Sequence, residues 1–265
     1  MEMILALLAA SSYALALTQV MPGLSHNEQI PARRVHLFAA LALLLHLFLL
    51  KDLILAEEGQ NLSLLNVASL ISFIISAIAT LASIRHRVWF LLPVVYSFAA
   101  INLCASTLLP SAFITHLEAH LTILLHISLA LFAYATLMIA CLYAVQLAYL
   151  DNKLRNKKKL SLNPNLPPLM AVERQLFKII LIGNLLLTAT LFTGFWFVGD
   201  MFTEGKAHKA ILSMSAWVIY TALLWGHYQR GWRGRRVIWF SIIGAFLLSL
   251  AYFGSRFVRE FIIGL

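Results

Sequence analysis

The sequence predicts an all-α polytopic membrane protein with eight transmembrane helices, in a single integral-membrane domain over residues 1–265. The chain is 61% hydrophobic and 12% charged, whereas soluble domains are roughly 45–50% apolar and about 25% charged. Its mean hydropathy is +0.85, and its apolar residues gather in runs close to the roughly 20 residues that span a membrane. The net charge of +9 does not indicate nucleic-acid binding, because the basic residues lie in short segments between the apolar runs.

Eight apolar segments account for most of the chain. We expect helices at about 4–20, 35–50, 62–84, 88–108, 121–150, 177–199, 210–228 and 237–255. Glu2 is the only charged residue before the first segment. A signal peptide instead carries a basic region there and a small-residue cleavage site. We therefore expect it to be a membrane helix.

The charged residues predict the orientation of the helices. Fifteen of the 20 Lys and Arg residues fall in the segments that follow the first, third, fifth and seventh helices. Eight of the 11 Asp and Glu residues fall on the opposite side. Because basic loops remain in the cytoplasm, we expect both termini to lie outside the cytoplasm.

The longest cytoplasmic connection is expected at 151–176, where a basic run is followed by Pro164, Pro167 and Pro168. Proline blocks helix continuation, so we interpret this segment as a topology anchor and a turn. The alternative is a docking site for anionic lipid or a cytoplasmic partner. Both interpretations also apply to residues 232–236, where Trp232 is an expected interface anchor.

The two cysteines do not predict a disulfide, zinc or redox site. Cys104 and Cys141 each lie inside an apolar segment and form no CxxC pair, so we expect buried thiols that behave as small hydrophobic groups. The chain contains no P-loop, GxSxG or HExxH pattern. No enzymatic reaction is predicted from these motifs.

Histidines within the apolar segments are the main candidate functional residues. His126 lies just inside the fifth helix, and a histidine in a membrane helix usually faces the protein interior and marks a functional site. At a rise of about 1.5 Å per residue, His126 and His46 both lie roughly 8 Å from the outer surface. His227 and His36 lie near the cytoplasmic surface. Depth thus pairs His46 with His126 and His36 with His227.

The helix faces that carry His126 and His227 suit a flat ligand. Small residues dominate the positions stacked on His126, which are Ala130, Ala133, Leu137, Ala140 and Ala144. Trp217 and Tyr220 share the face of His227. A neutral imidazole among small and aromatic side chains suits axial ligation of haem iron. The alternative is a histidine hydrogen-bonded to a neighbouring helix.

Three stretches resemble the CcsA/CcmC-type cytochrome c assembly family. LLHISLALFAYATLMIACLYAVQLAYL at 124–150 resembles the family's helix with His, Ser, small residues and Tyr, and NLSLLNVASLISF at 61–73 resembles the segment before it. Residues 209–254 resemble the closing pair of helices, including the His that ends the first of them. Taken whole, the chain is similar to the short eight-helix HemX-like or YpjD branch, which implies a multi-pass protein of the bacterial inner membrane.

The resemblance implies that membrane-embedded histidines bind haem on its way to apocytochrome c. By resemblance, His126 matches the ligand near the outer surface and His227 the ligand near the inner one. His46 is a further candidate by depth and not by motif. We expect Trp217 and Tyr220 to line the cofactor site, with membrane lipid and other membrane assembly proteins as partners.

The chain differs from the haem-handling members of that family at two places. VGDMFTEGKAHKAILSMSAW at 198–217 stands where those members carry a tryptophan-rich WWD segment, and no histidine follows His227. Direct cytochrome c synthetase activity is therefore not expected. Haem handling, cytochrome c assembly or its regulation is the function that we expect.

Two other functions are compatible with the same helices. The first is a cofactor-free scaffold or regulatory subunit of another membrane complex, acting through the segment 151–176. The second is a small transporter, which the absence of Asp and Glu inside the expected spans disfavours. Polar residues within the spans are explained by interhelical hydrogen bonds of about 1 kcal/mol or less each. They are Asn66, Asn102, Gln146 and Asn184.

Overall fold

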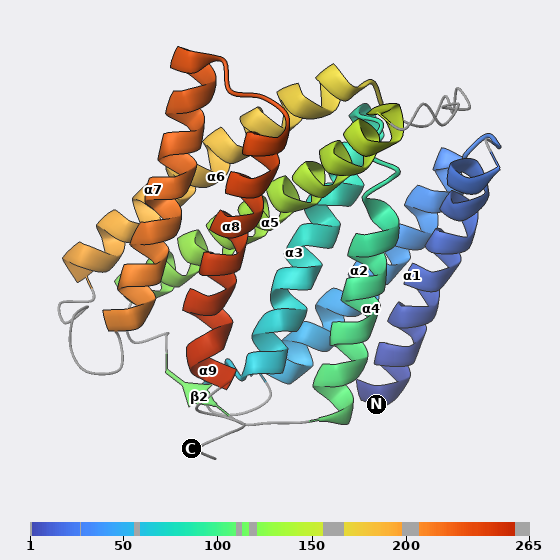
Figure 1. Ribbon diagram of the computed structural model, residues 1–265. Coiled ribbons are helices and arrows are strands. Elements are labelled where there is room, and N and C mark those ends of the chain that lie inside the picture. The colour runs from blue at the N-terminus through green and yellow to red at the C-terminus, as the bar shows by residue number, and fades with distance from the viewer. Residues whose placement is uncertain are drawn as a thin grey trace. The chain divides into compact units, whose positions relative to one another are not determined.

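The computed structural model describes residues 2–26, 28–55, 59–109, 113–116, 121–155, 167–197 and 207–257. In these residues the structure is helical apart from two short strands (Figure 1). The long helices are α1 (Glu2–Ser25), α2 (Ala32–Leu55), α3 (Leu64–Arg85), α4 (Leu92–Leu108), α5 (Leu121–Arg155), α6 (Leu169–Phe197), α7 (Ala207–Arg230) and α8 (Arg235–Ser249). A π-helical turn, η2 (Leu250–Gly254), and the short α9 (Ser255–Phe257) follow α8.

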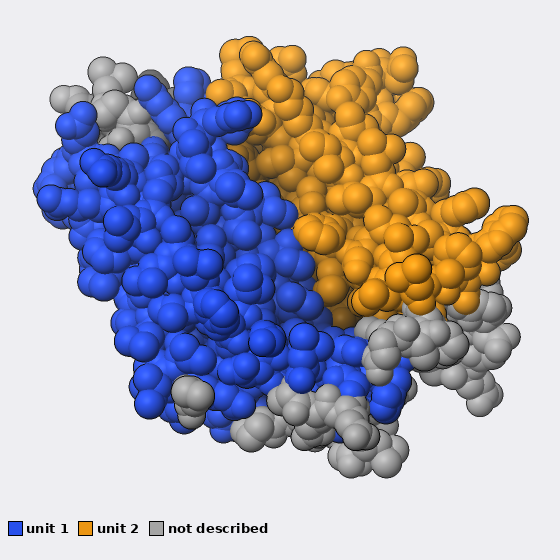
Figure 2. Space-filling view, turned by 180° about the vertical axis from the view of Figure 1, so that it is seen from behind, with its two compact units in different colours: residues 1–117, 159–168 blue, residues 118–158, 169–265 orange. Residues whose placement is uncertain are grey.

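The helices divide into two compact units (Figure 2). Unit 1 comprises residues 1–117 and 159–168, and unit 2 comprises residues 118–158 and 169–265. Within unit 1, α1 packs on α2 and α4, and α3 packs on the same two helices. Within unit 2, α5 packs on α6 and α8, and α7 packs on the same two. Each unit is therefore a closed ring of four helices, while the expectation of a single domain stays a prediction.

Seven helices in the described part of the chain are long and apolar enough to cross a membrane. The eighth, α4, has 17 residues and begins at Leu92, four residues later than expected. Pro93 is the reason: proline fits the first turn of a helix but clashes with the preceding turn when it is interior. The membrane class is confirmed, whereas the count of eight spans and the position of the termini stay predictions.

The connection predicted at 151–176 is shorter than expected. Helix α5 continues to Arg155 and α6 begins at Leu169, directly after Pro167 and Pro168. The sequence after Leu150 includes Lys, Leu and Arg, which have high helix propensity, so it extends α5 beyond the apolar run. Pro164 and most of the basic run lie in 156–166, outside the described residues.

Two of the polar residues expected to join helices do so. The Asn184 side chain donates to Thr221 Oγ1 at 3.1 Å, which links α6 to α7. The Asn66 side chain donates to the Leu53 carbonyl at 3.3 Å, which links α3 to α2. Asn102 instead donates to Phe98 in its own helix.

A short antiparallel ladder holds one end of unit 1. Strand β1 (Gln60–Asn61) pairs with β2 (Ile114–Thr115). Gly59 enters this ladder with φ near 115°, a conformation that favours glycine. The Asn61 side-chain oxygen accepts hydrogen bonds from the amides of Ser63 and Phe113, so the ladder is tied to the first turn of α3.

Candidate functional site

His227 lies in the last turn of α7, where the chain turns tightly into α8. Gly231 ends the helix with φ near 64°, and its amide donates to the His227 carbonyl at 3.1 Å. This is the left-handed cap that commonly ends helices at glycine. The turn brings the Trp232 carbonyl oxygen within 3.1 Å of His227 Nδ1.

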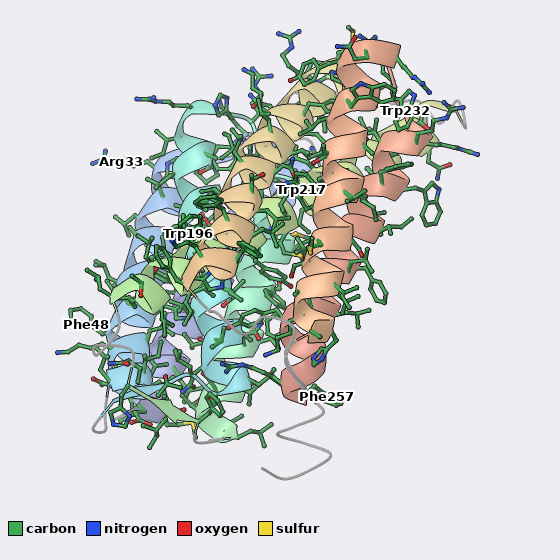
Figure 3. The ribbon with its side chains drawn as sticks, turned by 90° about the vertical axis from the view of Figure 1, so that its left-hand side faces the viewer. Arg33, Phe48, Trp196, Trp217, Trp232 and Phe257 are labelled. Atoms are coloured by element: carbon green, nitrogen blue, oxygen red, sulfur yellow. The ribbon has the colours of Figure 1, made fainter. Side chains whose placement is uncertain are left out.

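Packing of Trp232 fixes this turn. A Cβ atom at Gly226 would collide with the indole ring of Trp232, so only glycine at 226 leaves room for the ring. The Trp232 amide also donates to the Gly226 carbonyl at 3.0 Å. The Arg236 guanidinium lies 5.9 Å from the centre of the Trp232 ring. Figure 3 shows Trp232 at the end of unit 2 where α7 passes into α8.

The contact with Trp232 decides which nitrogen of His227 carries the proton. A carbonyl oxygen only accepts hydrogen bonds, so Nδ1 donates its proton and Nε2 retains a free lone pair. Phe177 of α6 stacks on the imidazole, with the ring centres 3.4 Å apart and the planes inclined by 15°. In the neutral imidazole, Nε2 is then the nitrogen left to act as a ligand atom, the arrangement typical of metal-binding histidines.

His126 is oriented in the same way near the other end of unit 2. Its Nδ1 atom lies 3.1 Å from Thr193 Oγ1. The Thr193 hydroxyl directs its single proton to the carbonyls of Ala189 and Thr190, at 2.9 and 3.0 Å. The hydroxyl therefore accepts from His126 Nδ1, and Nε2 of His126 also keeps its lone pair.

The two histidines mark separate positions. His126 contacts Thr193, and His227 stacks on Phe177. These two α6 residues are 16 positions apart, which is about 24 Å along a helix. Two axial ligands of one iron atom lie within a few ångströms of each other, so His126 and His227 do not share an iron. The expectation of one position near each membrane surface stays a prediction.

Exposed aromatic side chains surround the end of α6 next to Thr193. Phe192, Phe195 and Trp196 are mostly exposed, and the rings of Phe192 and Trp196 stack with their centres 5.7 Å apart. Trp196 is labelled in Figure 3. Such residues are common at membrane surfaces, and they also offer a flat apolar face to a planar ligand.

Trp217 and Tyr220 both join helices of unit 2. Trp217 Nε1 donates to Thr188 Oγ1 at 2.8 Å, from α7 to α6. The Tyr220 hydroxyl donates to the Ser241 carbonyl at 3.2 Å, from α7 to α8. Tyr220 is fully buried, and its ring occupies the space that a Cβ at Gly244 would need. A role for either residue in binding a cofactor stays a prediction.

His46 has a different environment, inside unit 1. It is fully buried, with Nδ1 at 3.2 Å from the Tyr13 hydroxyl and Nε2 at 3.0 Å from Ser69 Oγ. Both ring nitrogens are therefore engaged, as in the hydrogen-bonded alternative. His46 and His126 belong to different units, so their pairing stays a prediction, as does the pairing of His36 with His227.

The sequence did not reveal the residues that orient the two histidines of unit 2. Thr193 and the Trp232 carbonyl act across helices or turns, where spacing in the sequence gives no guide. Gly226 and Gly231 were the available signal, because two glycines around a histidine at a helix end indicate a tight turn. Within the described residues, no three His, Cys, Asp or Glu side chains gather to hold a metal ion. Cys104 and Cys141 are free.

Residues 35–263 match the family described as Cytochrome C assembly protein. The chain belongs to the cytochrome c assembly family. The match covers α3 to α9 and all but the first three residues of α2, and it includes His46, His126 and His227.

Two relatives place this cytochrome c assembly protein more closely. It is 49% identical to the inner membrane protein YpjD of Escherichia coli K12 over 261 residues, which cover 98% of this chain and 99% of that protein. It is 30% identical over 80 residues to the cytochrome c biogenesis protein CcsA of Synechococcus, covering 29% of this chain and 26% of that protein. No solved structure matches significantly. With seven helices long enough to span, the chain is a multi-pass inner-membrane protein.

Proposed function

We propose that this protein binds haem through His126 and His227 and acts in haem handling, cytochrome c assembly or its regulation. The observation that carries the proposal is the shared orientation of the two imidazoles. Each donates its Nδ1 proton to an oxygen of unit 2 and keeps a lone pair on Nε2. Neutral imidazole nitrogen is the usual protein ligand of haem iron.

The residues around both histidines fit such a ligand. The carbonyl of Trp232 and the hydroxyl of Thr193 hold the imidazoles in one orientation and one tautomer. Phe177 provides an apolar face beside His227, and the exposed Phe192, Phe195 and Trp196 lie within three residues of Thr193, the contact of His126. Haem bound at either position would supply an iron atom and a planar apolar ring, and the chain would supply one ligand nitrogen there and an apolar face.

His46 is the third candidate ligand, and its hydrogen bonds make it a less favourable ligand than His126 or His227. Both of its nitrogens are within hydrogen-bonding distance of hydroxyls of unit 1. Ligation of iron would require the ring to give up Tyr13 or Ser69. We therefore assign the ligand role to His126 and His227.

The test is the absorbance spectrum of the detergent-purified protein from haem-supplied cells, oxidised and reduced. We expect a haem spectrum that weakens in His126→Ala and in His227→Ala. His227→Gly supplied with free imidazole should regain part of the lost absorbance, because imidazole replaces the missing side chain. His86→Ala serves as the control, since His86 is exposed at the end of α3. Spectra without haem absorbance in all proteins would contradict the proposal.

A cofactor-free scaffold or regulatory subunit is the second candidate function. It is favoured by the polar atoms of His46, Trp217 and Tyr220, all of which bond to neighbouring helices. This function predicts a stoichiometric protein partner that co-purifies from haem-depleted cells. Absence of such a partner, together with a haem spectrum, would count against it.

A further inference from the structure

Helix α3 carries a continuous face of polar side chains through unit 1. Five hydroxyl residues recur every three or four positions, and all of them are buried. They are Ser69, Ser72, Ser76, Thr80 and Ser83. From Ser69 to Ser83 the face extends about 21 Å, most of the roughly 30 Å core of a membrane.

A histidine from α2 meets each end of this hydroxyl face. His46 Nε2 lies 3.0 Å from Ser69 Oγ, and His36 Nε2 lies 2.8 Å from Ser83 Oγ. His46 is fully buried, whereas His36 is half-buried and follows the exposed Arg33 and Arg34. One end of the face is therefore sealed inside the unit and the other is partly open.

Two tyrosines contribute hydroxyls between these ends. The Tyr13 hydroxyl of α1 lies 3.2 Å from His46 Nδ1. The Tyr96 hydroxyl of α4 lies 2.8 Å from Thr80 Oγ1. The two tyrosine rings contact each other, with centres 5.3 Å apart. All four helices of unit 1 thus contribute hydroxyl or imidazole groups along the hydroxyl face of α3.

Ser76 is the observation that points to a ligand. Its hydroxyl is completely buried and forms no hydrogen bond of good geometry with the described residues, although the Tyr13 hydroxyl is close enough to interact with it. It lies on the same face, one turn from Thr80 and close to Tyr13. A buried hydroxyl without a partner costs about 1–3 kcal/mol, and a bound water with several polar neighbours removes that cost.

The spacing of the hydroxyl residues along the face matches the reach of one bridging water molecule. Ser83 and Thr80 are three residues apart, and Thr80 and Ser76 are four apart. Such side chains are about 5–6 Å apart on a helix, and two hydrogen bonds of about 2.8 Å that meet at one water span the same distance.

We propose that a file of bound water molecules follows the hydroxyl face of α3 and lets His46 exchange protons with the end of unit 1 that carries His36. A helix face used only for packing would satisfy its hydroxyls on its own carbonyls, as Ser72 and Ser83 do. Ser76, which makes no such bond to its own helix, and the histidines at both ends set this face apart.

Each transfer conserves protons along the file. His36 takes a proton on Nδ1 and releases the Nε2 proton to Ser83, which donates its own proton to the carbonyl of Thr80 and therefore accepts from His36. Each hydroxyl or water accepts one proton on a lone pair and passes on the one it held, after the hydroxyls of Ser72, Thr80 and Ser83 turn away from the carbonyls of their own helix. His46 gains the final proton through Tyr13 and becomes imidazolium, and the reverse sequence discharges it. Around His46, the described contacts are Tyr13, Ser69 and the ring of Phe73.

Exchange of the histidine C2 hydrogen for deuterium, read by mass spectrometry, tests this proposal because it requires ring protonation and water at the ring. We expect His46 to exchange in the full-length protein although it is buried. Ser76→Val fills the water position and should slow that exchange at least tenfold. Ser11→Val is the matched control, because Ser11 is an exposed residue of α1 that bonds only to its own helix, and it should leave the rate unchanged.

A second variant shows whether slower exchange comes from the loss of a hydroxyl on this face or from misfolding. Thr80→Val keeps the shape of the side chain but removes the hydroxyl that meets Tyr96, and it should slow His46 exchange as well. Exchange at the exposed His86 and the thermal unfolding midpoint report whether each variant is folded. The proposal is overturned when His46 fails to exchange in the unsubstituted protein, or when both variants exchange at its rate.

Discussion

His227 Nδ1 lies 3.1 Å from the backbone oxygen of Trp232, five residues further along the chain. The same tight turn therefore ends α7, starts α8 and sets the tautomer of the histidine. Because a carbonyl does not donate, the imidazole presents Nε2 as a free ligand atom. The relationship depends on Gly226, beside which the Trp232 ring packs.

Gly226→Ala is expected to displace Trp232 and so to release His227 from the turn between α7 and α8. The added methyl group collides with the Trp232 ring, and such overpacking costs about 1–3 kcal/mol. Displacement of Trp232 removes the oxygen that orients His227, so we expect weaker haem absorbance and a lower unfolding midpoint. Gly254→Ala is the control, because a Cβ there meets only Leu250 at 3.8 Å. Equal behaviour of the two variants would contradict the role of Trp232.

Thr193→Val should weaken haem binding at His126. Valine keeps the shape of threonine but removes the oxygen that accepts the Nδ1 proton of His126. Loss of such a supporting group typically lowers metal affinity 10–100-fold. Thr193→Ser retains the hydroxyl and should bind nearly as well as the unsubstituted protein. Haem titration followed by absorbance distinguishes the two, and identical affinities would exclude this role for Thr193.

His46→Ala should affect stability more than haem content. The substitution leaves a cavity and two buried hydroxyls, on Tyr13 and Ser69, without a partner. Unpartnered groups of this kind and the cavity together cost about 2–5 kcal/mol. Thermal unfolding and haem content measured on one preparation check the prediction. Loss of most of the haem with unchanged stability would instead make His46 a ligand.

Tyr220→Phe should leave the haem spectrum unchanged. The Tyr220 hydroxyl already donates to Ser241, and the ring is packed where Gly244 leaves space for it. Loss of one interhelical hydrogen bond in a membrane protein costs about 0.6 kcal/mol on average. We therefore expect only a small decrease in the unfolding midpoint, and a shifted haem spectrum would show that Tyr220 contacts the cofactor.

The sequence predicted the helical membrane architecture because long apolar runs leave few alternatives to a membrane helix. The sequence predicted the residues at which helices begin and end less accurately. Pro93 delays α4 beyond the expected start, and the polar residues after Leu150 extend α5. Such ends depend on capping and helix propensity, which hydropathy does not report.

The candidate site was predictable only in part. The sequence identified His126 and His227, since a histidine is rare within an apolar run. It could not identify Thr193 or Trp232 as their partners, because one contact crosses between helices and the other uses a backbone oxygen. The same limit applies to His46: its depth was readable, but its contacts with Tyr13 and Ser69 depend on how three helices pack.

The most direct test of the central claim is the haem content of the double variant His126→Ala/His227→Ala. It should be measured by pyridine haemochrome against the double control His86→Ala/His208→Ala, in which both histidines are exposed. Haem binding through His126 and His227 predicts a control that retains its haem and a double variant with at least tenfold less. Equal haem content in the two proteins, both folded by thermal unfolding, would contradict it.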